Sequence, residues 1–418
     1  MLEGSSLAKK FLRFIMKAPV YPCINLIYLF SWIFPKDTNL WVFGARFADE
    51  YADNSRYLYE YMLNNKKGIN VIWITKNIRV HSWLTERGYP VLMLNSLKGI
   101  FAVVRAKVAI ISCGKADIHP WLLTSNHIII ELWHGVGYKK INYDAEIFNK
   151  WLASYGKLGK AAETIVFFPF PFFKYSYRMV ISTSELMTQR FSSSFRMDVK
   201  NIPITGYPRN DVLFEPDNTV SLREYLKIEP SKKLCLFVPT YRAGGGESLI
   251  QVFFPDEASL KSIDNELDKS KAVLLVKLHP SQNRDITELR KKKYKNIIFW
   301  ENSNIEYDIN LMLKDTEILL TDYSSVSFDY LLLDRPIIFT PFDLEEYLRT
   351  DTKFYDRSED VTPGPKAKDW PEVFRLIDEV IQNDHWKQER ETVCNRFNKF
   401  RDNKSSERVF QAIQEVLS

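Results

Sequence analysis

The sequence lacks the short motifs that mark several large enzyme classes. None of the patterns GxxxxGK[ST], GxGxxG, HExxH and Asp-x-Asp occurs in its 418 residues. Their absence argues against an ATPase with a phosphate loop, a dinucleotide-dependent oxidoreductase and a transferase that clamps phosphate through an Asp-bound metal. If the protein binds phosphate, its own polar groups must therefore neutralise most of the negative charge of the phosphate.

The sequence also has little cysteine and no paired cysteine motif. Its four cysteines are far apart, at Cys23, Cys113, Cys235 and Cys394. Without a CxxC pair, neither a zinc site nor a disulfide framework is indicated, and no metal-binding set is predicted. This pattern fits a reducing cytoplasm best.

The sequence also has little excess of charge of one sign, because its formal net charge is only +5. Much of the excess lies in residues 1–36, whose charged residues are Lys9, Lys10, Arg13, Lys17 and Lys36 against Glu3. A nucleic-acid binder would spread basic residues over a polar face, so nucleic acid is excluded as a partner. With 45% hydrophobic residues, the chain is long enough for two domains with large cores.

Residues 1–36 are predicted to be a helical segment that associates with a membrane. Leu7, Phe11, Phe14 and Ile15 share one helical face, and basic residues lie largely off it. Residues 20–34 are apolar but fall short of the roughly 20 residues that a spanning helix needs. Two alternatives stay open: a signal peptide, although no small-residue cleavage site follows, and a helix packed on the protein body.

From residue 37 onward, apolar strand-like runs alternate with helical patterns, which predicts doubly wound α/β domains. The expected strands are residues 40–44, 70–75, 91–94, 108–112, 127–132, 179–182 and 202–206, then 234–238, 272–278, 297–300, 318–320 and 337–339. Residues 370–417 are expected to be helical. We predict Rossmann-type domains at 37–213 and 214–418 that face each other across a cleft, the glycosyltransferase-B (GT-B) architecture.

Polar clusters follow several of these strands directly. In an open α/β sheet the ligand site lies at the carboxyl ends of the strands. The clusters contain His134 with Gly135, Thr240 with Arg242, and His279. An arginine, a histidine and a helix start suit a diphosphate. A lone histidine is more often structural, so the clusters are informative only together.

The fourth cluster lies in a strand-helix-strand unit at residues 317–340. The turn into its helix runs from Thr321 and Asp322 to Ser324 and Ser325. A helix that begins there would direct backbone N–H groups past the strand, which favours phosphate binding. The alternative is that Asp322 or Ser324 simply caps the helix.

These clusters resemble the CDP-glycerol glycerophosphotransferase family, which includes teichoic acid primases and polymerases and enzymes of capsule synthesis. The resemblance covers about residues 39–378 and departs from the family pattern after Gly135 and at Tyr241. The matching motifs are Trp133-His134-Gly135, residues 206–211 (GYPRND), residues 239–242, His279-Pro280, residues 321–325 with Asp329, Arg335-Pro336, Phe342-Asp343-Leu344 with Tyr347, and Pro363-Gly364-Pro365.

The resemblance implies a peripheral enzyme at the cytoplasmic face of the bacterial plasma membrane. It would move glycerol phosphate or ribitol phosphate from CDP-glycerol or CDP-ribitol to a hydroxyl of a lipid-linked or growing glycan, and release CMP. The family's histidines that match His134 and His279 are important for activity. Its carboxyl-terminal domain binds the CDP donor, so residues 37–213 would bind the acceptor.

The expected roles of the residues follow from this chemistry. His134 is predicted to be the general base, because an imidazole can take a proton from the attacking hydroxyl at neutral pH. Arg242, His279, Ser324 and Ser325 would hold the phosphates. The remaining predicted substrate-binding residues are Gly135, Arg209, Thr240, Thr321, Asp322 and Asp329. No cofactor is certain, and assistance by Mg²⁺ is left open.

Two other functions remain as alternatives. A GT-B glycosyltransferase would attack the anomeric carbon of a nucleotide sugar. A non-catalytic nucleotide-binding subunit of an envelope-polymer assembly would bind the donor without turnover.

Overall fold

The computed structural model describes residues 21–66, 68–145, 177–216, 221–240, 242, 252–279, 289–301, 304–350 and 353–418. The predicted amphipathic helix within residues 1–20 lies outside these ranges. The chain forms two compact units. Unit 1 comprises Met1–His134, Ile147–Val180 and Phe410–Ser418, and unit 2 comprises Gly135–Glu146 and Ile181–Val409. These units divide the chain differently from the predicted boundary after residue 213.

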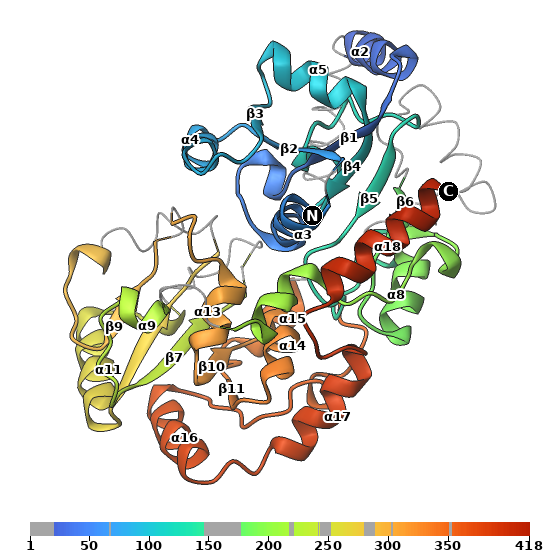
Figure 1. Cartoon of the computed structure of the whole chain (residues 1–418). Coiled ribbons are helices and arrows are strands. Elements are labelled where there is room, and N and C mark those ends of the chain that lie inside the picture. The colour runs from blue at the N-terminus through green and yellow to red at the C-terminus, as the bar shows by residue number, and fades with distance from the viewer. Residues whose placement is uncertain are drawn as a thin grey trace, which may run out of the picture. The chain divides into compact units, whose positions relative to one another are not determined.

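Unit 1 is built on a parallel six-stranded sheet in the order β3-β2-β1-β4-β5-β6 (Figure 1). This order, in which the chain moves outward in one direction and then in the other, is that of a Rossmann-type sheet, as predicted. The strands are β1 (Asp37–Phe43), β2 (Asn70–Thr75), β3 (Val91–Met93), β4 (Ala106–Ile111), β5 (Ile128–Glu131) and β6 (Tyr177–Val180).

Helices connect these strands because their sequences change from short apolar runs to a helical apolar period. For example, Ser96 caps the helix at residues 97–105, accepting the N–H of Gly99 at 3.0 Å. Trp41, Phe43 and Trp73 are fully buried in the core. The helices are α2 (Tyr21–Ile33), α3 (Asp53–Asn65), α4 (Ile78–Glu86) and α5 (Leu97–Arg105), with 3-10 turns η2 (Arg46–Ala48) and η3 (Lys115–Asp117).

Unit 2 contains a parallel five-stranded sheet in the order β11-β10-β7-β8-β9. Each strand lies where the apolar runs predict it. The strands are β7 (Lys233–Val238), β8 (Ala272–Val276), β9 (Ile297–Phe299), β10 (Ile318–Thr321) and β11 (Ile337–Phe339). The second predicted Rossmann-type sheet is therefore present.

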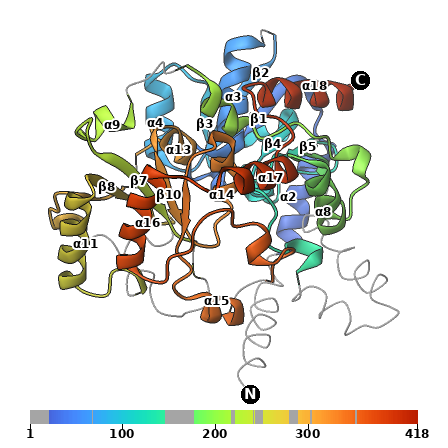
Figure 2. The same ribbon diagram turned by 90° about the horizontal axis from the view of Figure 1, so that it is seen from below.

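Helices also follow the strands of unit 2, and the last helix, α18, begins in unit 2 and ends in the segment Phe410–Ser418 that belongs to unit 1. Helices α11 and α16 pack beside each other into one core with the strands (Figure 2). The helices are α8 (Glu185–Phe195), α9 (Leu222–Tyr225), α11 (Glu257–Lys269), α13 (Ile309–Asp315), α14 (Val326–Tyr330), α15 (Leu344–Thr350), α16 (Trp370–Gln382), α17 (Lys387–Phe397) and α18 (Ser405–Leu417). The 3-10 turns are η4 (Asn142–Asp144), η7 (Val199–Asn201), η8 (Pro208–Phe214), η10 (Leu331–Leu333) and η11 (Ser358–Asp360).

The strand predicted at residues 202–206 is wrong. Only an isolated bridge forms there, between Ser182 and Ile204. Pro203 has no N–H to donate to a ladder, and Pro208 opens the 3-10 turn η8 shortly afterwards. The apolar run is therefore too short and too interrupted to become a strand.

Candidate functional site

The candidate site residues of unit 1 lie in the loop that follows β5. Trp133 has a positive φ of 57°, which is unfavourable for a residue with a Cβ. Two buried side chains hold this backbone. The Glu131 carboxylate accepts the Trp133 N–H at 2.9 Å, and the Asn54 amide donates to the Trp133 carbonyl at 2.8 Å. The strained turn that leads into His134 is therefore braced from both sides.

The His134 imidazole is half-buried rather than enclosed in the hydrophobic core. Its Nδ1 lies 2.9 Å from the Ser112 carbonyl oxygen. Because a carbonyl can only accept a hydrogen bond, Nδ1 must carry the proton in this contact, and Nε2 is then the basic nitrogen. The local geometry therefore suits His134 to act as a base through Nε2.

Ser112 is itself fixed at the carboxyl end of β4. Asp117 accepts the N–H groups of Ser112 at 2.8 Å and Cys113 at 2.6 Å. The hydroxyls of Ser55 and Ser112 lie 2.8 Å apart. Burial raises the pKa of Asp117 to about 6, against the opposing effect of its backbone hydrogen bonds. A buried polar network thus fixes the position of the Ser112 carbonyl, which in turn orients His134.

Burial also raises the pKa of Glu131 well above its ordinary value, and the nearby Asp117 adds to the effect. The sequence places Glu131 in the strand before the histidine but gives no sign that it braces Trp133. Asn54, Ser112 and Asp117 were not predicted as site residues either. Their roles depend on contacts between distant parts of the chain, although Asn54 and Asp117 are conspicuous as polar residues beside apolar runs.

Unit 2 has its own group of candidate site residues, in which Asp322 joins the carboxyl ends of β7 and β10. Its Oδ1 accepts the Thr240 N–H at 2.8 Å and the Thr240 hydroxyl at 2.6 Å. The Thr321 hydroxyl donates to the Val238 carbonyl at 2.7 Å. The predicted residues Thr240, Thr321 and Asp322 are therefore together, and the buried Asp322 holds two strand ends in place.

Arg242 completes this junction. Its Nη2 donates to Asp322 at 2.7 Å, while Nε and Nη2 form a fork with Asp343 at 2.8 Å each. Nη1 donates to the Thr240 carbonyl at 2.7 Å. Four of the five guanidinium N–H groups are thereby occupied, so Arg242 chiefly organises the strand ends, and one N–H has no acceptor among the described residues. Its partner Asp343 belongs to a motif of the family resemblance but was not predicted as a site residue.

Arg209 and Asp329 form a buried ion pair with a distance of 2.6 Å. Asn210 donates to the other oxygen of Asp329 at 3.0 Å, so the pair fastens η8 to α14. Both charged side chains are less than 5% exposed. This arrangement is that of a structural pair that supports the site, rather than of two groups open to substrate.

Gly135 lies against the start of α14. A Cβ at this position would come within 2.7 Å of the Ser325 Oγ, and the φ of Gly135 is 155°. The Tyr207 hydroxyl donates to the Gly135 carbonyl at 2.8 Å. The backbone of Gly135 can approach Ser325 this closely because it has no side chain.

Ser324 and Ser325 are half-buried at the turn into α14. The Ser325 side chain makes no cap hydrogen bond, and the contact from the Val326 N–H to the Ser324 hydroxyl is long, at 3.5 Å. The alternative that Ser324 merely caps the helix is thus weak, whereas Asp322 does have a structural role, because its Oδ1 accepts the backbone N–H groups of Tyr323 and Thr240. Helix α14 has only five residues, so its dipole is a small part of any phosphate binding.

His279 follows β8, which neighbours β7 in the sheet. Its position puts it at the same sheet edge as Thr240 and Asp322, and it is half-buried. Pro280 and Tyr241, which belong to the same predicted motifs, lie outside the described residues. Within the described ranges, no group of three or more His, Cys, Asp or Glu side chains is placed to hold a metal ion.

Comparisons with known proteins agree with the motifs. The family model described as CDP-Glycerol:Poly(glycerophosphate) glycerophosphotransferase matches residues 26–415. The teichoic acid poly(ribitol-phosphate) polymerase of Bacillus spizizenii is 28% identical over 91% of this chain and 57% of its own length. The teichoic acid glycerol-phosphate transferase of Staphylococcus aureus is 27% identical over 90% of this chain and 92% of its own. The chain thus spans little more than half of the first relative.

A solved structure of the wall teichoic acid polymerase TagF has the same fold. It matches with a TM-score of 0.74 and 22% identity over 99% of this chain and 98% of that one. This likeness supports the predicted GT-B-like α/β class. Because the family model covers most of the sequence, the chain belongs to the CDP-glycerol:poly(glycerophosphate) glycerophosphotransferase family.

Proposed function

We propose that this chain transfers glycerol phosphate or ribitol phosphate from a CDP-polyol to a hydroxyl of a lipid-linked or growing cell-envelope glycan. Family membership and the teichoic acid relatives support this activity. Within the chain, the carrying observation is the 2.9 Å contact between His134 Nδ1 and the Ser112 carbonyl. It leaves Nε2 as the nitrogen that can take a proton from the acceptor hydroxyl.

The reaction is a substitution at the distal phosphorus of the donor. The acceptor oxygen forms the new P–O bond, its proton goes to His134, and the bond to CMP breaks. The phosphate of CMP has a second pKa near ~6, as for other phosphomonoesters, so the leaving group needs little protonation at neutral pH. The attacking hydroxyl therefore gains more from catalysis than the leaving group.

The donor phosphates would be held at the carboxyl ends of β7, β8 and β10. Ser324 and Ser325 supply accessible hydroxyls, His279 a ring, and Arg242 its remaining N–H. The buried contacts of Thr240, Thr321 and Asp322, and the pair of Arg209 with Asp329, would keep these groups in place. One TagF structure is of a variant soaked with CDPG, which is consistent with a CDP-linked donor in this family.

The chain would work at the cytoplasmic face of the bacterial plasma membrane. Helix α2 presents exposed apolar side chains, among them Leu26 at 67% and Ile33 at 64% exposure. The described ranges contain no helix with the length and hydropathy of a bilayer span. Attachment through an apolar helix face lying in the interface is the mode that we infer. Deletion of residues 1–35 should move the protein from the membrane fraction to the soluble one.

Product analysis tests the proposed reaction. Purified protein is incubated with CDP-glycerol, CDP-ribitol or a nucleotide sugar and a lipid-linked acceptor, and products are identified by mass spectrometry. We expect a phosphodiester product and free CMP. Release of a nucleoside diphosphate would indicate the glycosyltransferase alternative instead, and donor binding without any turnover would indicate a non-catalytic subunit. Parallel reactions with Mg²⁺ and with EDTA show whether a divalent ion assists the diphosphate.

A further inference from the structure

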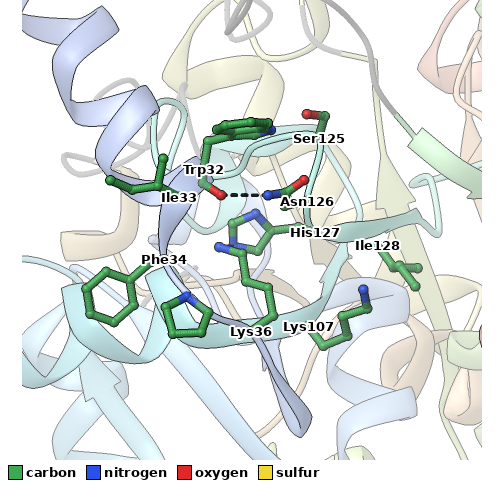
Figure 3. A pocket seen from close by; sticks show the side chains of 10 residues that line it. Trp32, Ile33, Phe34, Lys36, Lys107, Ser125, Asn126, His127 and Ile128 are labelled. Atoms are coloured by element: carbon green, nitrogen blue, oxygen red, sulfur yellow. Dashed lines mark hydrogen bonds between the residues drawn. The ribbon is translucent and has the colours of Figure 1, made fainter.

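Unit 1 has a pocket at the sheet edge opposite the His134 loop. It lies at the amino ends of β1, β4 and β5, beside the end of α2, and has a volume of about 430 Å³ (Figure 3). His134 follows the carboxyl end of β5. In a parallel sheet the amino ends of the strands and their carboxyl ends lie on opposite sides, so the pocket is separate from the His134 loop.

The wall of this pocket is basic on one side and apolar on the other. Lys36 and Lys107 line it together with Asn126, while Trp32, Ile33 and Phe34 provide the apolar side. No aspartate or glutamate is among its lining residues. Asp37, which follows Lys36 in the sequence, is paired with Arg105 at 3.8 Å. The positive charge of the wall is thus not neutralised from within the pocket.

The Lys36 ammonium is positioned firmly. It donates to the carbonyls of Ser31 and Val104, at 2.9 and 2.5 Å, close to the carboxyl ends of α2 and α5. A simple helix-capping role would explain those two bonds. It does not explain the third contact, in which Nζ lies 3.2 Å from His127 Nε2.

The His127 tautomer decides the meaning of that contact. The Thr124 backbone N–H donates to His127 Nδ1 at 3.0 Å, so Nδ1 is an acceptor and the ring proton is on Nε2. Nε2 then donates to the Val103 carbonyl at 3.0 Å. His127 cannot accept from Lys36 in this state, so the ammonium meets another donor instead of an acceptor.

The two lysines also disfavour each other. Burial lowers the pKa of Lys36 to about 8, and the positive charge of Lys107 contributes to the decrease. An anion in the pocket would face both ammonium groups and relieve this repulsion. The pocket has space for a phosphate with its water, since its volume is many times the ~30 Å³ share of one water in the liquid.

The surface beside the pocket is unusually apolar. Helix α2 contains no charged residue, and Leu29, Phe30 and Trp32 are 51%, 50% and 43% exposed. The apolar surface continues through the ring of Phe34, whose centroid lies 5.6 Å from that of Phe101 on α5. A basic pocket adjoining an exposed apolar face is complementary to a bilayer surface, where phosphates lie directly above acyl chains.

We propose that this pocket binds the headgroup phosphate of an anionic phospholipid while the exposed face of α2 enters the membrane interface. Lys36 and Lys107 contact the phosphate, and Asn126 fixes the wall by donating to the Trp32 carbonyl at 2.6 Å (Figure 3). The proposal rests on the membrane attachment inferred above and adds a lipid-specific contact to it.

Vesicle flotation with the full chain tests this proposal. Vesicles of phosphatidylcholine alone are compared with vesicles of equal parts phosphatidylcholine and phosphatidylglycerol. Lys107→Glu reverses a charge in the pocket, and Lys107→Met removes the charge but keeps an apolar stem. The matched control is Lys76→Glu, since Lys76 is exposed in the same unit after the carboxyl end of the six-residue β2, about 20 Å along the strand direction from its amino end.

We expect the native chain to prefer the anionic vesicles and Lys107→Glu to weaken that binding by at least about tenfold, with Lys107→Met reducing it about fivefold. Lys76→Glu should change it less than about twofold, because that charge is about two screening lengths away. None of the three lysine substitutions should alter binding to vesicles of phosphatidylcholine alone. Leu29→Asp on α2, in contrast, should weaken binding to both vesicle types.

If Lys107→Glu and Lys76→Glu lose equal amounts of binding to the anionic vesicles, the attraction is diffuse electrostatics, and the proposal of a phosphate-binding pocket is overturned. A native chain that binds the two vesicle types equally would also overturn it. If Lys107→Glu does not fold, the result for Lys107→Met decides. The assay needs no CDP-polyol or turnover, so failure of the transferase proposal would not imitate either outcome.

Discussion

Replacing Asn54 tests whether the brace around Trp133 serves catalysis. Asn54→Ala removes the amide that donates to the Trp133 carbonyl at 2.8 Å and the Leu132 carbonyl at 3.2 Å. Two such hydrogen bonds contribute roughly 1–3 kcal/mol together. The left-handed backbone of Trp133 costs roughly 1–2 kcal/mol. The two hydrogen bonds are therefore comparable in free energy to the strain that they support, and the turn should relax when they are lost.

If the turn relaxes by about 1.4 kcal/mol, the fraction of molecules with a correctly placed His134 falls about tenfold. We therefore expect kcat of Asn54→Ala to fall by about an order of magnitude, while the affinity for CDP-polyol, measured by calorimetry, changes little. The matched control is Asn65→Ala on the same helix, whose exposed amide donates to the Tyr61 carbonyl at 2.9 Å.

Both variants are assayed well below their melting temperatures, so that a change in kcat does not reflect unfolding. Asn65→Ala should retain kcat within about twofold. If Asn54→Ala also keeps its kcat, the strained turn does not position the histidine, and the reasoning is refuted.

Two further predictions concern buried charge. Arg242→Lys cannot reproduce the fork to Asp343 together with the bond to Asp322, so urea unfolding should show a loss of about 2–4 kcal/mol; an unchanged midpoint would contradict this role. Asp117 has a pKa raised to about 6 by burial, so the stability from its protonated form is fully present below about pH 4 and lost as the pH rises through 6. Urea unfolding at a series of pH values should show that the free energy of unfolding of the native chain declines by roughly 2–3 kcal/mol between pH 4 and 6. Asp117→Asn should not show this decline. If the two proteins have parallel pH profiles, the prediction is contradicted.

The sequence predicts the strands well because burial on both faces leaves continuous apolar runs with little ambiguity. The strand at residues 337–339 and the helical stretch that begins at residue 370 are found where expected. Elements fail where backbone chemistry overrides hydrophobicity, as at Pro203 in the wrongly predicted strand.

The candidate site is predictable only as a set of positions at strand ends. The sequence identifies Arg242 and Asp329 as polar residues near apolar runs, but it does not indicate their partners. Those are Asp343, 101 residues away, and Arg209, 120 residues away. Because Arg242 pairs with the carboxylate of Asp343 and Asp329 pairs with the guanidinium of Arg209, the expected role of both residues changes from contact with a ligand to support of the site.

The same limit applies to His134. Its motif predicts a functional histidine, yet the choice of nitrogen depends on the Ser112 carbonyl, 22 residues earlier and directly after another strand. Parallel pairing of β4 with β5 brings the two ends together. The tautomer therefore follows from tertiary structure and could not be derived from local sequence.

The most direct measurement is the rate of CMP release by His134→Ala with CDP-glycerol or CDP-ribitol and a lipid-linked acceptor. Loss of a general base should lower kcat by about 10²–10⁴-fold, while the donor dissociation constant stays within about twofold of the native value. A variant that still releases CMP and forms phosphodiester at a rate within a few-fold of the native chain would contradict the assignment of His134 as the base.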